Sequence, residues 1–316
     1  MVGAGAVAAR HLRTLLAMDD VEVAGVADPA LERARELAGE AGAATYPNHM
    51  ELLAAERLDA LYICVPPFAH GAPELAAIEA GLPFFVEKPV AIDQETAAGI
   101  AAALAGRPLV TCTGYHWRWL DIFDRAAGLL AERPARLVQC AWLDKVPPPP
   151  WWLRRDGSGG QTIEQTTHVL DAARGLAGDV VEVHGFGARG LPAAAIHEVS
   201  VASLRFASGA LGTVASTCLL PRLHRAGVQV VADGLSLELS ETELVVDSDG
   251  RRSTWKAAAD ARPQPDRDFV AAVRGGPDRI RVPWPEAYRT HLLACAITRS
   301  ADEGRPLAVA TGDGDG

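Results

Sequence analysis

The sequence lacks any long hydrophobic run, contains few cysteines and carries less positive than negative charge. No apolar stretch reaches the roughly 18 residues that a membrane helix needs, so we expect no membrane partner. The five cysteines are widely spaced and never form a C-x-x-C pair, which argues against a disulfide framework or a metal site and favours a soluble, cytoplasmic protein. A net charge of −10 argues against nucleic acid as a partner.

The length of 316 residues predicts two domains. Up to residue 112, short apolar runs alternate with helical stretches, which is typical of βαβ units around a parallel sheet. The strands expected there span 21–27, 60–65, 84–87 and 109–113. Alternating runs between residues 135 and 246 predict a large, mostly antiparallel, open sheet. We therefore expect an α/β domain over 1–117, an α+β domain over 118–310 and a disordered tail over 311–316.

A glycine turn and an acidic residue point to a dinucleotide. Residues 3–8 read Gly-Ala-Gly-Ala-Val-Ala, which fits the G-x-G-x-x-A turn whose following helix binds a pyrophosphate. Asp28 ends the next expected strand, where a carboxylate can accept a hydrogen bond from a ribose hydroxyl. NAD is favoured because Asp28 repels a 2′-phosphate, but NADP stays open if Arg33 or Arg35 reaches the pocket. The residues expected at the cofactor here are Gly3, Gly5, Ala6, Val7 and Asp28.

The first strand of this domain is short in the sequence. Only Met1 and Val2 precede the glycine turn, whereas a strand usually has about five residues. We expect either that the native start lies upstream of Met1 or that the strand is unusually short and weakens cofactor binding.

Two further segments each follow an expected strand, where ligands lie in open α/β sheets. The first contains Pro66, Pro67 and His70, and the second begins with Glu87 and Lys88. A solvated ion pair explains Glu87 and Lys88 poorly, because they follow an apolar run and use one of only three lysines. We expect both segments to line the cofactor site.

Glu164 and His168 are four residues apart in a helix expected over 162–176. This spacing places both on one helix face, where the carboxylate can bond one imidazole nitrogen and leave the other for proton transfer. A purely structural histidine is the alternative.

Aromatic and arginine side chains are the candidates for substrate contact. Tyr115 and Arg118 follow the last strand of the first domain, and Trp151 and Trp152 precede a Gly-Gly loop at 159–160. Aromatic faces and guanidinium groups suit recognition of a polyol or glycoside, although tryptophan is also an ordinary core residue.

Together these motifs resemble the Gfo/Idh/MocA oxidoreductases, a family that includes glucose-fructose oxidoreductase and inositol dehydrogenases. The resemblance covers essentially the whole chain, and its most specific part is Glu-Lys-Pro at 87–89 followed by acid-x-x-x-His ending at 168. It implies a Rossmann-type domain followed by a substrate and oligomerisation domain. It also implies that Lys88 and His168 lie beside the nicotinamide and the reacting carbon. Glu164 stands where many members have Asp.

The function expected is hydride transfer between NAD and a hydroxyl carbon of a sugar, glycoside or cyclitol. His168 would take the hydroxyl proton, Lys88 would stabilise the alkoxide, and Glu164 would orient His168. Two alternatives stay open: redox-neutral elimination or epimerisation through a transient keto-sugar, and a regulator that binds NAD(P) without turnover. The resemblance further implies a homodimer or homotetramer formed through the second-domain sheet.

Overall fold

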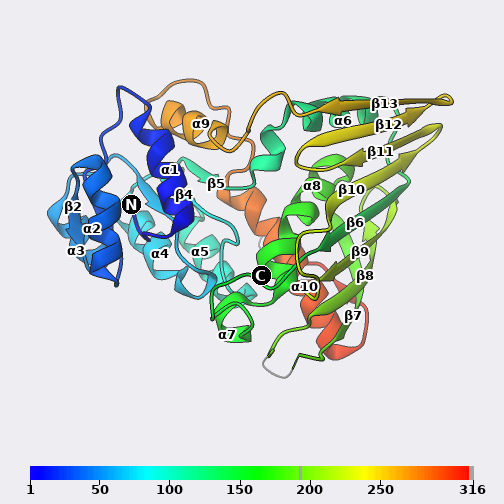
Figure 1. Ribbon diagram of the computed structural model, residues 1–316, viewed down its shortest axis with the longest axis horizontal. Helices are drawn as coiled ribbons and strands as arrows, with labels where there is room; N and C mark the ends of the chain where they lie inside the picture. The colour runs from blue at the N-terminus through cyan, green and yellow to red at the C-terminus, as the bar shows by residue number, and fades with distance from the viewer. Residues whose placement is uncertain (192–193, 313–316) are drawn as a thin grey trace. The chain divides into compact units, whose positions relative to one another are not determined.

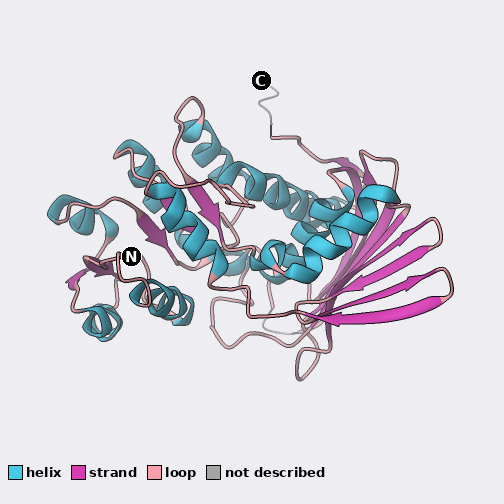
Figure 2. Ribbon diagram, turned by 90° about the horizontal axis from the view of Figure 1, so that it is seen from above, coloured by secondary structure: helices cyan, strands magenta, loops and turns pink. Residues whose placement is uncertain are grey.

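Figures 1 and 2 show the computed structural model, which describes residues 1–191 and 194–312. The chain forms two compact units: unit 1 contains 1–91, 95–114 and 262–284, and unit 2 contains 92–94, 115–261 and 285–316. Most of the tail expected to be disordered, residues 313–316, lies outside the described residues.

Unit 1 contains a segment that the domain boundary expected at residue 117 places in the second domain. Residues 262–284 belong to it because they pair with its last strand, β5 (Thr111–Thr113). The backbone N–H of Thr113 donates to the oxygen of Val282 at 2.9 Å, and the N–H of Trp284 donates to Thr111 Oγ1 at 2.9 Å. The helix α9 (Gln264–Val273) lies in this segment and packs on β5 and α1.

The core of unit 1 is a parallel sheet flanked by helices (Figure 1). Its strands are β1 (Gly25–Ala27), β2 (Ala44–Tyr46), β3 (Leu61–Ile63), β4 (Phe84–Val86) and β5. Its helices are α1 (Ala6–Leu16), α2 (Leu31–Ala41), α3 (His49–Ala55), α4 (Ala72–Glu79) and α5 (Gln94–Leu104). Strands β1, β3 and β4 are apolar and fully buried, and the helices are half-buried, which is the pattern that a doubly wound sheet requires.

The short N-terminal segment occupies the place of the first strand. Val2 forms parallel bridges to Ala27 on one side and to Ile63 on the other. Its N–H donates to Tyr62 at 2.7 Å, and its oxygen accepts from Cys64 at 2.8 Å. Val2 thereby pairs with the facing edges of β1 and β3, at the place where a longer first strand was expected.

Among the described residues, unit 2 holds a nine-stranded sheet in the order β13-β12-β11-β10-β6-β9-β8-β7-β14. Every neighbouring pair is antiparallel except β6 with β9. The strands are β6 (Leu137–Leu143), β7 (Val180–Ala188), β8 (Val199–Phe206), β9 (Leu211–Thr217), β10 (Arg225–Ala232), β11 (Leu235–Leu239), β12 (Glu243–Ser248), β13 (Arg251–Lys256) and β14 (Leu307–Ala308). This is the expected fold class, a parallel α/β unit and a large, mostly antiparallel sheet.

Helices cover one face of this sheet (Figure 2). Helix α8 (Thr167–Ala177) packs on β6 and β10, and α6 (Asp121–Glu132) packs on β11 and β12. The unit also contains the long helix α10 (Trp284–Glu303) and the short helix α7 (Arg155–Ser158). Strand β8 alternates strictly between exposed and buried residues, so its second face is open to solvent.

Candidate active site

The glycine turn forms a sharp bend that opens onto the start of α1. Gly3 has φ +92°, and a Cβ there would lie 2.2 Å from the oxygen of Cys64, so only glycine fits. Gly5, which caps α1, faces open space, and no side chain caps the helix. The N-terminal amides of α1, from Ala6 and Val7 onward, therefore offer the anion site that a diphosphate requires. The turn fits a bound dinucleotide.

Asp28 lies directly after β1, and its carboxylate is tied to the glycine turn. Oδ2 accepts from the N–H of Ala4 at 2.9 Å, and Oδ1 accepts from the N–H of Ala30 at 2.8 Å. The guanidinium of Arg33 also reaches Oδ1, at 3.3 Å, while the rest of its side chain stays largely exposed. The carboxylate is thus fixed for a ribose hydroxyl, with one positive charge beside it.

The turn after β3 is held by a buried pair. Pro66 and Pro67 lead through a short 3-10 turn, η1 (Pro67–Ala69), into His70. His70 Nδ1 and Glu74 Oε1 are 2.6 Å apart, and Glu74 Oε2 accepts from the N–H of Gly71 at 2.7 Å. Because the His70 side chain is fully buried, its contribution in this structure is to fix the turn.

Glu87 and Lys88 follow β4, but their side chains have different surroundings. The Glu87 carboxylate is buried and accepts from His11 Nε2 at 2.9 Å and from Arg10 at 3.1 Å. Burial raises the pKa of the Glu87 carboxyl, but the hydrogen bond and charge of His11 outweigh this and bring it below the usual value. Lys88 is half-buried, and the Lys88–Pro89 peptide bond is cis. Glu87 therefore lies inside unit 1, directly before Lys88.

In unit 2, His168 lies on the first turn of α8 among aromatic rings. Its imidazole stacks on Trp142 with ring centroids 5.5 Å apart and an interplanar angle of 19°. Trp117 stacks at 6.5 Å and 22°, and the Tyr115 ring meets the imidazole edge-on at 5.9 Å. The Tyr115 hydroxyl is in turn 2.6 Å from Thr167 Oγ1. These contacts fix the plane of the imidazole ring.

Glu164 lies in a π-helical turn, η3 (Thr162–Thr166), rather than in the single α-helix expected over 162–176. The π-helix bonds residues five apart, so the helix expected over 162–176 is divided into η3 and α8, with Glu164 in the first part and His168 in the second. The indole Nε1 of Trp152 donates to Glu164 Oε2 at 2.7 Å. Trp152 is fully buried against Ile196 and Cys218. It therefore supports Glu164 from the core, while Trp151 beside it is half-buried.

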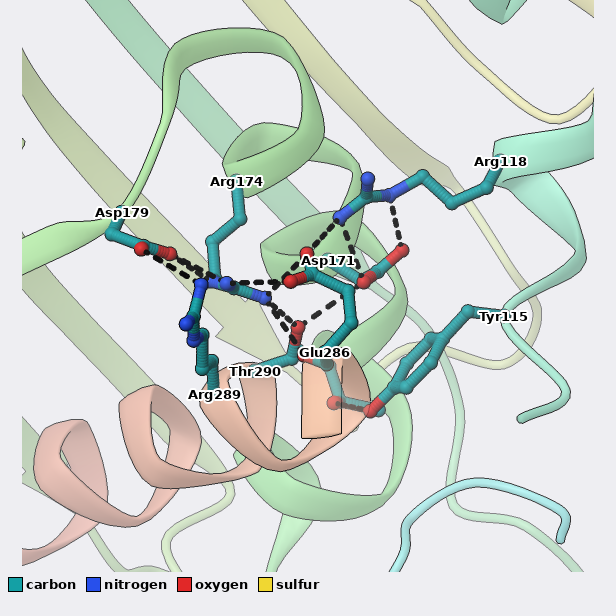
Figure 3. Close-up of polar contacts among 9 residues, drawn as sticks. Tyr115, Arg118, Asp171, Arg174, Asp179, Glu286, Arg289 and Thr290 are labelled. Carbon is teal, nitrogen blue, oxygen red and sulfur yellow. Dashed lines mark hydrogen bonds and ion pairs between the residues drawn. The ribbon is translucent and has the colours of Figure 1, made fainter. Parts of the chain in front are cut away.

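Arg118 belongs to an ion network around α8 and α10 (Figure 3). Its guanidinium donates to both carboxylate oxygens of Asp171, at 2.8 and 3.1 Å, and to Glu286 at 3.2 Å. Burial lowers the pKa of Arg118, but the charge and hydrogen bond of Asp171 outweigh this and raise it. Arg174 extends the network to Thr290 at 2.7 Å. Substrate contact by Arg118 would require this bidentate pair to open.

Several residues at these places have no motif in the sequence. Trp142, which stacks on His168, comes from β6. The alternating pattern there predicts a strand but gives no sign of this contact. His11 and Asp266 bond each other at 2.7 Å although 255 residues separate them. The period of α1 could have placed His11 on the buried helix face, but the sequence contains no signal for its partner.

Within residues 1–191 and 194–312, none of the helices has the length and apolar character needed to cross a membrane. The same part of the chain contains no group of three or more His, Cys, Asp or Glu residues arranged to hold a metal ion.

Comparisons with known proteins place both units. Residues 1–115 match the family model described as "Oxidoreductase family, NAD-binding Rossmann fold", and residues 134–238 match the GFO/IDH/MocA C-terminal domain. The chain is similar to myo-inositol dehydrogenase Hyg17 of Streptomyces leeuwenhoekii, with 30% identity over 324 residues that cover 96% of this chain and 97% of that protein.

Solved structures match over nearly the full length. Levoglucosan dehydrogenase in complex with NADH and L-sorbose has a TM-score of 0.85 at 19% identity, covering 98% of this chain and 97% of that chain. The WlbA dehydrogenase from Bordetella pertussis, in complex with NADH and UDP-GlcNAcA, has a TM-score of 0.86 at 21% identity with the same coverage. At these identities the matches establish the fold.

Proposed function

Since the chain belongs to the Gfo/Idh/MocA oxidoreductase family, we propose that this NAD-dependent enzyme transfers a hydride between the nicotinamide and a secondary alcohol carbon of a cyclitol or sugar. The observation that carries the proposal is the full-length similarity to a myo-inositol dehydrogenase. The glycine turn, the uncapped start of α1 and the anchored Asp28 carboxylate support the cofactor assignment independently.

The proton is assigned to His168. During oxidation the imidazole would take the hydroxyl proton of the substrate, and the ring contacts of Trp142 and Trp117 would keep its plane fixed as it does so. Glu164, held by the Trp152 indole, is proposed to orient His168. Trp152 is thus a positioning residue instead of the substrate contact first expected.

Lys88 is proposed to stabilise the negative charge that develops on the substrate oxygen. Its ammonium suits this task because it is half-buried and follows a carboxylate that is itself neutralised by His11 and Arg10. The nicotinamide, when bound, supplies the hydride acceptor. Tyr115 and Trp151 remain the proposed substrate contacts, and Pro66, Pro67 and His70 remain the proposed edge of the cofactor site.

The open face of the unit 2 sheet supports the proposed homo-oligomer. Outward-facing apolar side chains line up across its strands: Phe186 pairs with Val201 in register, and Leu137 pairs with Leu211. Phe186 is 59% exposed and Leu211 is 53% exposed, which is unusual for such residues on a sheet. Light scattering should find a dimer or tetramer that Val201→Glu dissociates, whereas Glu182→Gln on β7 should not. A monomeric wild type would contradict this assignment.

A cytoplasmic location is also part of the proposal. All five cysteines are free thiols and four are buried, which fits a reducing compartment. Fractionation of the source cells followed by immunodetection tests it, and recovery in a secreted fraction would contradict it.

The test of the activity is a screen for reduced nicotinamide. Purified protein is mixed with NAD and a panel of cyclitols, sugars and glycosides, and the absorbance of NADH is followed. Accumulating NADH with at least one cyclitol or sugar supports the proposal. Product without accumulating NADH would indicate the redox-neutral reaction, and NAD binding without turnover of any panel member would indicate a regulator.

A further inference from the structure

Helix α1 places a buried histidine between two carboxylates of unit 1. His11 is 2% exposed, and its Nε2 lies 2.9 Å from Glu87 Oε1 while its Nδ1 lies 2.7 Å from Asp266 Oδ1. An ionised carboxylate can only accept hydrogen bonds, so each bond requires a proton on the histidine nitrogen. With both carboxylates ionised, the geometry therefore calls for an imidazolium with both nitrogens protonated.

The charges around His11 balance in that state. Two carboxylates, Glu87 and Asp266, face two cations, His11 and Arg10, and Arg10 also donates to Glu87 at 3.1 Å. Burial lowers the pKa of His11, but the hydrogen bonds to Asp266 and Glu87 outweigh this and raise it to about 9.

The other titratable groups at this cluster come from β3, the residue after it, and β5. Tyr62 on β3, Cys64 just beyond β3 and Cys112 on β5 each interact with Asp266. Burial raises the pKa of all three well above their ordinary values, so they stay neutral. The positive charge that offsets the two carboxylates comes from His11 and Arg10, with Lys88 a further cation acting on Glu87. Burial raises the pKa of Asp266, and the hydrogen bond of His11 acts against this.

The Glu87 carboxylate is enclosed on three sides. His11 and Arg10 donate to it, and the backbone of Gly114 lies so close that a Cβ there would be 2.3 Å from Oε1. The N–H of Glu87 itself donates to Ile63 at 2.9 Å. A side chain held in this way fixes the backbone at residue 87, and Lys88 is the next residue.

We propose that His11 is a positioning residue that, as an imidazolium, joins α1 and α9 to Glu87 and thereby holds Lys88 in place for the chemical step. The inference rests on the proposed function for its kinetic consequence. Its structural part, the doubly protonated ring and its coupling to Lys88, can be measured without turnover.

Nuclear magnetic resonance tests the structural part. In ¹⁵N-histidine protein at neutral pH, the His11 ring should show two protonated nitrogens, and a neutral tautomer would overturn the proposal. The chain has three lysines, so lysine-selective labelling gives three side-chain signals. His11→Gln should move the Lys88 signal, assigned with Lys88→Arg, and leave those of Lys145 and Lys256 in place. An unmoved Lys88 signal would also overturn it.

Kinetics test the positioning role on the substrate found in the screen. His11→Gln should lower kcat by about tenfold or more while the Kd of NAD changes by less than about threefold. His49→Gln, the same replacement on α3 of unit 1, is the matched control and should leave both constants unchanged.

A double variant separates lost charge balance from lost packing. In the double variant His11→Gln with Asp266→Asn, the two new side-chain amides can bond each other, and the amide at position 11 can still donate to Glu87. The kcat should therefore recover by about threefold or more over that of His11→Gln alone. A single variant with normal kcat, or an equal loss of kcat and NAD affinity without recovery in the double variant, would contradict the positioning role. An inactive wild type would instead refute the proposed function and leave the spectroscopic result standing.

Discussion

Replacing Asp28 should change which nicotinamide cofactor the enzyme prefers. The carboxylate is 7% exposed and accepts hydrogen bonds from the N–H groups of Ala4 and Ala30, so its position is fixed before the cofactor arrives. A fixed carboxylate can accept from a ribose hydroxyl and repels a 2′-phosphate. Arg33 acts in the opposite direction, because its guanidinium lies 3.3 Å from Asp28 Oδ1 and would attract that phosphate.

The size of the preference follows from these charges. Two unit charges about 5 Å apart interact by about 1–3 kcal/mol at an effective dielectric constant between about 20 and 80. Because about 1.4 kcal/mol corresponds to tenfold in affinity, the repulsion from Asp28 favours NAD by about 5- to 150-fold. The Arg33 side chain is 60% exposed, so solvent screens its opposing contribution and NAD stays preferred.

Fluorescence titration of both cofactors measures the ratio of their Kd values. Asp28→Asn removes the charge at nearly constant shape and should bring the ratio close to one. Arg33→Gln should increase the NAD preference several-fold, by about 0.5–1 kcal/mol. If the wild type binds NADP as tightly as NAD, or if Asp28→Asn leaves the ratio unchanged, the role given to Asp28 is wrong.

Three further predictions concern the glycine turn, the ion network and pH. Gly3→Ala should unfold unit 1 or abolish NAD binding because its Cβ would meet Cys64, whereas Gly5→Ala should keep the melting temperature and raise the Kd of NAD. If calorimetry and NAD titration show equal effects for the two variants, the geometry of the turn is contradicted. Arg118→Ala leaves buried Asp171 without its bidentate partner and should lower the free energy of unfolding in urea by about 3–5 kcal/mol, and Arg118→Lys should lower it by an intermediate amount. A loss under about 1 kcal/mol for Arg118→Ala would contradict the burial of the pair. The pKa of His11 rises from about 6.5 in the unfolded chain to about 9 in the folded protein, so the stability that its imidazolium contributes is complete below pH 6.5 and is lost as pH rises through 9. Urea unfolding at several pH values should show the free energy of unfolding falling over this range in the wild type and falling less in His11→Gln. The same pH dependence in both proteins would exclude the imidazolium.

Much of the fold could be predicted because its strands are apolar and its helices amphipathic. Strands β1, β3, β4 and β5 of unit 1 lie within the apolar runs that predict them and are shorter than those runs, and strands β6, β8 and β9 lie in the alternating region between residues 135 and 246. Strand β13 has the sequence Arg-Arg-Ser-Thr-Trp-Lys and was not predicted, because an edge strand with exposed residues needs no apolar face. Helix α9 was not predicted, and its segment fell within the second domain expected over 118–310, since nothing local shows that residues 262–284 return to β5.

The candidate site could be predicted where its chemistry is local in the sequence. The glycine turn and Asp28 were identified together, and the N–H of Ala4 donates to the Asp28 carboxylate as their assignment to one site requires. The single helix expected over 162–176 is divided into a π-helical turn and α8, and the bond from the Trp152 indole to Glu164 has no signal in the sequence. The His11 bridge could not be predicted because one of its carboxylates lies 255 residues away.

The most direct test of the central claim is the transfer of a label from substrate to cofactor. The protein is incubated with NAD and carbon-deuterated myo-inositol or, in parallel, other deuterated members of the sugar panel, and the nicotinamide is analysed by mass spectrometry. The account predicts deuterated NADH from the wild type and at least about a hundredfold less from His168→Ala and Lys88→Ala at saturating cofactor. Bound NAD that acquires no deuterium from any panel member, or full transfer by His168→Ala, would contradict it.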